Sequence, residues 1–128
     1  MGVQLGMTQN TDTRMRLWID DERVTPAEFS HAAQSSAQAI RLLSTERDAG
    51  RQVELVSFDH DLGYCWEDGH HLIDGGIRDD TSRPVMLWMV EADYWPAEIR
   101  FHTANPVGRQ WLVGMARRYA PASVVVGR

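Results

Sequence analysis

The sequence contains no lysine, and all thirteen of its basic side chains are arginine. No lysine is therefore available to any mechanism that depends on one. Cys65 is the only cysteine, which excludes an intrachain disulfide and a cluster of thiolate metal ligands and fits a reducing, cytoplasmic environment. The sequence also lacks an apolar run near the roughly 20 residues needed to span a bilayer, so we expect no membrane association.

The composition indicates one folded domain. With 128 residues, 43% of them hydrophobic and 24% charged, the chain is large enough to bury a single core and has the balance of an ordinary globular protein. We expect a disordered leader over residues 1–13 and a single domain over residues 14–128. The formal net charge of -5 argues against broad binding of duplex nucleic acid through phosphate neutralisation.

Charge is unevenly distributed along the chain. Residues 59–80 carry seven carboxylates and, apart from histidine, a single basic side chain, Arg78. Residues 101–128 contain arginines and no acid. This polarity suits a metal ion beside a phosphate pocket, and it is also typical of solvated loops followed by an arginine-rich helix.

Apolar runs alternate with helical patterns, which predicts a parallel sheet. Serine and proline residues mark where the helices begin. Strands are predicted over residues 15–19, 29–33, 53–58, 99–103 and 123–126, and helices over residues 37–49, 84–94 and from 106 to the proline at 121. Residues 63–83 are acidic and glycine-rich without periodicity, and they are predicted to form a long loop that acts as a functional lid or is disordered.

Polar and acidic residues follow three of the predicted strands. The carboxyl ends of parallel strands lie on one edge of the sheet, and ligands bind there where the strand order reverses. We therefore expect one crevice to gather Asp20, Asp21, Asp59, Asp61, His102, Thr103 and Asn105. Crowded carboxylates repel one another unless a cation neutralises them, so the pattern predicts a divalent ion, Mg²⁺ or Mn²⁺, as the cofactor. Merely solvated acidic loops are the alternative.

Alternate side chains of an extended segment share one side. Asp59 and Asp61 are therefore expected to point together toward the ion, while His60 points away and is structural. Beyond the next strand, Pro106 begins a helix whose free backbone N–H groups form an anion site, and Arg109 is expected to contact a phosphate there. A surface arginine one turn into a helix is the alternative for Arg109.

The predicted loop holds three weaker candidates. The histidines at 70 and 71, with nearby acids, have the composition of a metal cluster but no defined spacing. Cys65 lies in an acidic stretch that disfavours a thiolate nucleophile. Trp66 is the tryptophan best placed to stack on a base or close over a ligand. The acids near the histidine pair are Glu67, Asp68 and Asp74.

Three ordered motifs carry a resemblance to a known family. The runs LWIDDERVTP, FDHDLG and HTANPVGR occur in this order. Together they resemble the cyclic-phosphate processing receiver domains, over roughly residues 15–120. The resemblance implies a receiver-like (flavodoxin-like) α/β fold, a three-layer sandwich around a mostly parallel sheet of four to five strands. The first receiver helix is expected to be lost, because only Val24 to Phe29 separate the acidic turn from the next strand.

The resemblance also implies a role in processing cyclic phosphates of nucleotides or RNA ends. We expect a metal-dependent phosphoesterase, with the ion on Asp20, Asp21, Asp59 and Asp61 and the phosphate on Thr103, Asn105 and Arg109. The expected catalytic residues are Asp59, Asp61 and His102, with His102 as general acid or base. Asp59 as a phosphorylated nucleophile is an alternative. A conventional phosphoacceptor receiver is disfavoured, since it uses a lysine that this chain lacks. The main rival is a non-catalytic receiver-like module that binds a phosphorylated ligand or a protein partner.

Overall fold

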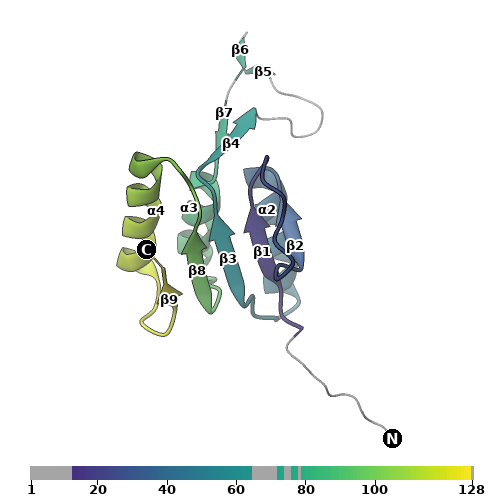
Figure 1. Cartoon of the computed structure of the whole chain (residues 1–128). Coiled ribbons are helices and arrows are strands. Elements are labelled where there is room, and N and C mark those ends of the chain that lie inside the picture. The colour runs from purple at the N-terminus through teal and green to yellow at the C-terminus, as the bar shows by residue number, and fades with distance from the viewer. Residues whose placement is uncertain (1–12, 65–71, 74–75, 78, 128) are drawn as a thin grey trace, which may run out of the picture.

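Five strands form a fully parallel sheet at the centre of the protein (Figure 1). The computed structural model describes residues 13–64, 72–73, 76–77 and 79–127. The strand order is β2-β1-β3-β8-β9, which is the flavodoxin-like order when these strands are numbered along the chain. The receiver-like α/β fold is therefore confirmed. The strands are β1 (Arg16–Ile19), β2 (His31–Ala33), β3 (Leu55–Phe58), β8 (Glu98–Phe101) and β9 (Val125–Val126).

Three helices connect these strands: α2 (Ser36–Asp48), α3 (Arg83–Ala92) and α4 (Pro106–Tyr119). Their connections all step in the same direction across the sheet, and right-handed connections of that kind put helices on one face. Accordingly, α2 packs against α3 and α3 against α4. None of the helices in the described ranges has the length and apolar composition needed to cross a bilayer.

An irregular segment, residues 20–30, covers part of the opposite face of the sheet. No helix forms between β1 and β2, where every residue is described, so the loss of the first receiver helix is confirmed. The Phe29 ring lies 5.1 Å from the Trp18 ring, and Glu28 pairs with Arg16 at 3.2 Å and Arg100 at 3.4 Å. Within the described residues, the third layer of the sandwich is this segment.

The core lies between the sheet and its helices. Alternate strand side chains point into it, among them Ile19, Val56 and Ile99, which are completely buried. Met86 and Leu112 reach it from α3 and α4. Each such side chain stabilises the fold by about 1.5–3 kcal/mol. The edge strand β9 is shorter than predicted, and its Val125 is 60% exposed.

The prediction that residues 63–83 form a long loop needs correction where the structure describes them. The described parts are paired strands: β4 (Asp61–Tyr64) pairs antiparallel with β7 (Asp79–Thr81), and β5 (Leu72–Ile73) with β6 (Gly76–Ile77). The register shifts within β4, where Gly63 has a φ of 73°. Backbone pairing of this kind needs no apolar alternation, which is why composition predicted a loop.

The base of this extension is tied to α2. Asp80 accepts hydrogen bonds from the Ser36 backbone N–H and hydroxyl, both at 2.7 Å. The Ser35 side chain accepts from the Gln38 N–H at 3.1 Å, as predicted for an N-cap. Two acceptors thus hold the start of α2, and one of them comes from the strand that precedes α3.

Candidate metal and phosphate site

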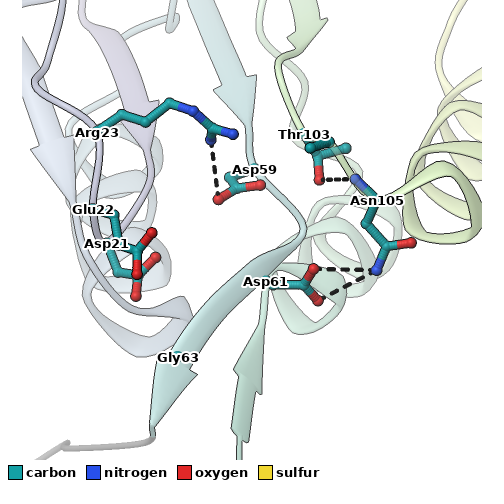
Figure 2. Close-up of a pocket in the computed structure, with 9 residues that line it drawn as sticks. Asp21, Glu22, Arg23, Asp59, Asp61, Gly63, Thr103 and Asn105 are labelled. Carbon is teal, nitrogen blue, oxygen red and sulfur yellow. Dashed lines mark hydrogen bonds and ion pairs between the residues drawn. The ribbon is translucent and has the colours of Figure 1, made fainter.

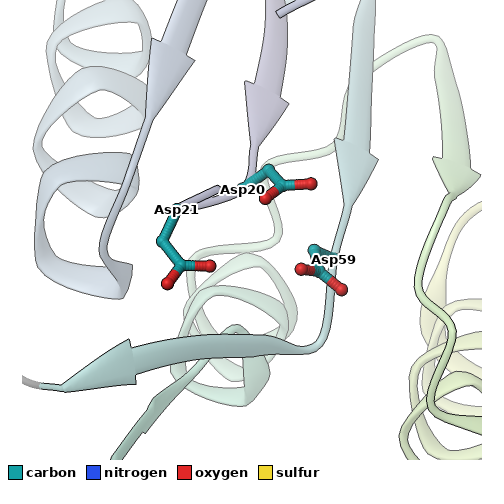
Figure 3. Close-up of side chains that lie close together, drawn as sticks. All are labelled: Asp20, Asp21 and Asp59. Atoms are coloured by element: carbon teal, nitrogen blue, oxygen red, sulfur yellow. The ribbon is translucent and has the colours of Figure 1, made fainter. Parts of the chain in front are cut away.

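Three carboxylates meet where β1 and β3 end. Asp20 and Asp21 follow β1, Asp59 follows β3, and these strands lie side by side with Ile19 opposite Phe58. One oxygen from each acid lies within 4.8 Å of the other two, and Figure 3 shows the three groups facing one another. The strand order reverses at this point, which is where ligands bind in such sheets.

Asp20 is the buried anchor of the cluster. Its side chain is inaccessible to solvent, and its Oδ1 accepts the backbone N–H groups of Glu22 at 2.8 Å and Arg23 at 3.0 Å. Its Oδ2 lies 2.8 Å from Arg23 Nη1 and 3.0 Å from His102 Nε2. Burial acts to raise the pKa of Asp20, but these hydrogen bonds and the neighbouring charge hold it below its usual value, so the group is ionised.

Asp21 is in the opposite electrostatic position. Burial raises its pKa, and the charges of Glu22, Asp20 and Asp59 raise it further. Gly63 lies against it, because a Cβ at Gly63 would be 2.6 Å from Asp21 Oδ2. A crowded carboxylate of this kind is stabilised by a cation.

A cavity of about 310 Å³ opens beside the cluster (Figure 2). The residues that line it come from the ends of three parallel strands and from β4. They are Asp21, Glu22, Arg23, Asp59, Asp61, Gly63, Thr103, Ala104 and Asn105. The cavity therefore combines carboxylates with a hydroxyl, an amide and one guanidinium.

Asp61 lies on the far side of this cavity from Asp21. His60, which is buried, accepts a hydrogen bond from Arg83 Nε at its Nε2 (2.9 Å), so its Nδ1 carries the proton and donates to Asp61 Oδ1 at 2.9 Å. This hydrogen bond is the main reason why the pKa of Asp61 is lowered. Asp61 does not belong to the group of three carboxylates, and Asn105 Nδ2 donates to it at 3.1 Å.

Thr103 and Asn105 line the cavity as predicted, whereas Arg109 does not. The Asn105 amide is engaged at both ends, since its Oδ1 caps α4 at the Gly108 N–H, 3.0 Å away. The Thr103 hydroxyl accepts from the Asn105 N–H at 3.1 Å and retains its own proton for donation. Arg109 donates through Nη2 to the Phe101 carbonyl at 3.1 Å.

His102 lies behind the cavity. Because Asp20 is ionised, Nε2 carries the proton and donates to it, and Nδ1 accepts from the Ser57 hydroxyl at 2.8 Å. Burial lowers the pKa of His102 although the charge of Asp20 raises it. The contacts match the order of a Ser-His-Asp triad, but Ser57 is only 2% exposed and cannot reach a substrate. The His102 ring stacks on the Trp18 ring, with 3.7 Å between the ring centroids and 6° between the ring planes, and this contact fixes its orientation.

The chain matches the model of the family described as "Cyclic-phosphate processing Receiver domain" over residues 15–118. The chain belongs to this family. No curated protein and no solved structure matches it.

All three motifs of this cyclic-phosphate processing receiver domain meet at the site. The first motif carries Asp20 and Asp21, the second Asp59, and the third Thr103. A glycine joins the second and third motifs, since a Cβ at Gly108 would lie 2.3 Å from the His60 ring. The structural role predicted for His60 agrees with this packing.

Four residues that line the cavity of this receiver domain were not predicted from the sequence: Glu22, Arg23, Gly63 and Ala104. A signal existed for two of them. Arg23 directly follows three acids, and Gly63 closes the second motif two residues after Asp61. The weaker candidates lie outside the described residues: Cys65, Trp66, Glu67, Asp68, His70, His71 and Asp74.

Proposed function

We propose that this receiver domain is a metal-dependent phosphoesterase that acts on cyclic phosphates of nucleotides or RNA ends. The observation that carries the proposal is the convergence of Asp20, Asp21 and Asp59 beside a cavity with a hydroxyl donor, Thr103. The description of the family, cyclic-phosphate processing, supports the choice of substrate class.

The donor set fits a hard divalent cation. All three clustered ligand atoms are carboxylate oxygens, which suit Mg²⁺ or Mn²⁺. Gly63 leaves the space in which Asp21 Oδ2 sits, and burial together with the neighbouring carboxylates raises the pKa of Asp21, an effect that a bound cation would offset. We therefore assign the ion to Asp20, Asp21 and Asp59, and we assign Asp61 to the substrate side of the cavity.

The residues of the chain then have separate tasks. A bound divalent ion supplies positive charge that polarises the phosphoryl oxygen and eases deprotonation of the attacking water. The Thr103 hydroxyl donates to a phosphate oxygen. Asp61, across the cavity from Asp21, accepts a proton from the attacking water and returns it to the ester oxygen that leaves when the P–O bond of the ring breaks. His102 orients Asp20 through Nε2 instead of reaching the substrate.

Incubation with a panel of 2′,3′-cyclic nucleotides and Mn²⁺ tests this proposal. We expect ring opening to a monophosphate, and a loss of turnover of at least about a hundredfold in Asp59→Asn. Asp48→Asn is the matched control, since Asp48 is an exposed carboxylate on α2. No turnover of any member of the panel would remove the enzymatic claim.

A non-catalytic module that binds a phosphorylated ligand is the second candidate. One observation favours it: both ring nitrogens of His102 are engaged by Ser57 and Asp20, and His102 does not line the cavity. This candidate keeps the metal and predicts that mass spectrometry recovers the bound nucleotide unchanged. A conventional phosphoacceptor receiver remains disfavoured by the absence of lysine, and we expect neither acetyl phosphate nor beryllofluoride to perturb the protein.

A further inference from the structure

Arg23 bridges the two strands that form the site. Its Nη1 lies 2.8 Å from Asp20 Oδ2 and 3.4 Å from Asp59 Oδ2, so one nitrogen serves acids from β1 and β3. Figure 2 shows the guanidinium extending over Asp59 at the wall of the cavity. The guanidinium thus lies against two of the three acids that we assign to a cation.

The charges around the cavity make Arg23 important for any phosphate that enters. Four carboxylates line the described cavity, and Arg23 is the one cationic side chain among them. The net negative charge of this lining repels a phosphate. The positive charge that can offset this repulsion comes from Arg23, once it is free of the carboxylates, and from a bound metal ion. The four acids are Asp21, Glu22, Asp59 and Asp61.

A metal ion and the bridging guanidinium compete for the same oxygens. A divalent ion on Asp20 and Asp59 would repel the guanidinium that contacts both. The Arg23 side chain is 45% exposed, so water can solvate the released guanidinium, and the cation would replace its charge beside the buried Asp20 carboxylate. Asp20 would still keep two backbone N–H groups and His102 as donors.

We propose that Arg23 is the phosphate-recognition residue of this site, held on Asp20 and Asp59 until a cation releases it. The inference rests on the function proposed above. Once released, Arg23 presents a planar fork of N–H groups at the cavity wall, and such a fork matches two phosphate oxygens. Arg109, the residue predicted from sequence, lies outside the cavity lining and donates to the Phe101 carbonyl.

This exchange makes cation and phosphate bind in order. Without metal, Arg23 is occupied and the four acids repel an anion. With metal, the acids are neutralised and Arg23 is released, so both changes favour the phosphate. We expect nucleotide binding to require the metal, whereas metal binding does not require the nucleotide.

Calorimetry on Arg23 variants tests the proposal. Mn²⁺ is titrated alone, and adenosine 3′-monophosphate, a ring-opened product that the proposed reaction does not consume, is then titrated into Mn²⁺-saturated protein. Arg23→Gln should bind Mn²⁺ roughly two- to fivefold more tightly, because a competing cation is gone. It should bind the nucleotide at least about tenfold more weakly. Arg23→Lys keeps the charge without the fork and should lie between the two in nucleotide affinity. Arg117→Gln, an exposed arginine on α4, should change neither.

Three results would overturn the inference. They are weaker Mn²⁺ binding by Arg23→Gln, unchanged nucleotide binding by Arg23→Gln, and loss of nucleotide binding in Arg109→Gln but not in Arg23→Gln. If the wild type binds no Mn²⁺ or no nucleotide, the proposed function and this inference fail together. If the wild type binds both without turnover and Arg23→Gln behaves as expected, only the catalytic claim fails and the role of Arg23 stands.

An NMR measurement reports on the guanidinium directly. The Arg23 Nε–Hε resonance should shift on addition of Mg²⁺ and shift again on addition of adenosine 3′-monophosphate. If the chemical shift of this resonance does not change on addition of Mg²⁺, the guanidinium is not displaced and the proposal is wrong.

Discussion

Replacing Gly63 with alanine separates the backbone requirement of the site from its steric requirement. Gly63 has a φ of 73°, a left-handed conformation that costs a residue with a Cβ roughly 1–2 kcal/mol. Alanine recovers part of this by restricting the unfolded chain, which leaves a net loss of about 1 kcal/mol. For a domain of this size, that loss lowers the melting temperature by roughly 3–4 °C.

The steric part of this change falls on the metal site. The new Cβ would lie 2.6 Å from Asp21 Oδ2, closer than real Cβ contacts come. The carboxylate must retreat by roughly half an ångström or more to reach ordinary contact distance. Metal sites tolerate smaller errors than this, so we expect Mn²⁺ affinity to fall by about tenfold or more.

Gly50→Ala is the matched control for Gly63→Ala. Gly50 has a φ of 72°, and no heavy atom lies within 4 Å of a Cβ built there. Both variants should therefore lose similar stability in thermal melts, while only Gly63→Ala loses Mn²⁺ affinity in calorimetry. Wild-type Mn²⁺ binding by Gly63→Ala, or an equal loss in Gly50→Ala, would refute the steric reasoning.

Three further predictions concern packing, pH and metal removal. Gly108→Ala puts a Cβ 2.3 Å from the His60 ring and should cost about 1–3 kcal/mol in urea unfolding, and wild-type stability would contradict this packing. The Arg51 hydrogen bonds lower the pKa of Glu46, so this pair contributes stability above the unfolded pKa near 4.5 that is lost as pH falls through the lowered folded value. The melting temperature of Glu46→Gln should therefore lie below that of the wild type at neutral pH and converge with it in acid, and parallel pH profiles would be evidence against the pair. EDTA should abolish nucleotide binding reversibly, with Mn²⁺ restoring it, and binding that survives the chelator would exclude the metal role.

The strand-helix alternation and the acids at the strand ends were predictable, because each depends on local pattern plus one rule of parallel sheets. Asp20, Asp21 and Asp59 each follow a buried strand directly, so the end of the strand fixes where the side chain lies. For the three carboxylates to meet, β1 and β3 need only be neighbours in the sheet. The flavodoxin-like strand order makes them so.

Asp61 and Arg109 show where local pattern is insufficient. Residues 59–61 were expected to form one extended run, but β3 ends at Phe58 and β4 begins at Asp61 with a different partner. The chain changes direction between them, and Asp61 therefore faces Asn105. Arg109 lies in the first turn of α4, but the rotamer that brings its guanidinium to the Phe101 carbonyl depends on tertiary packing.

The missing receiver helix bears on the proposed movement of Arg23. Residues 20–30 form no helix, and Arg23 follows the turn that the Asp20 carboxylate makes with two backbone N–H groups. Those hydrogen bonds fix the backbone at Arg23 independently of its guanidinium. A helix at this position would pack the arginine stem against neighbouring turns and the sheet. Here the side chain stands on an anchored turn and is 45% exposed, so it can exchange the carboxylates for a phosphate without moving the backbone that holds Asp20 and Asp21. Loss of the helix thus supplies the freedom that the exchange requires.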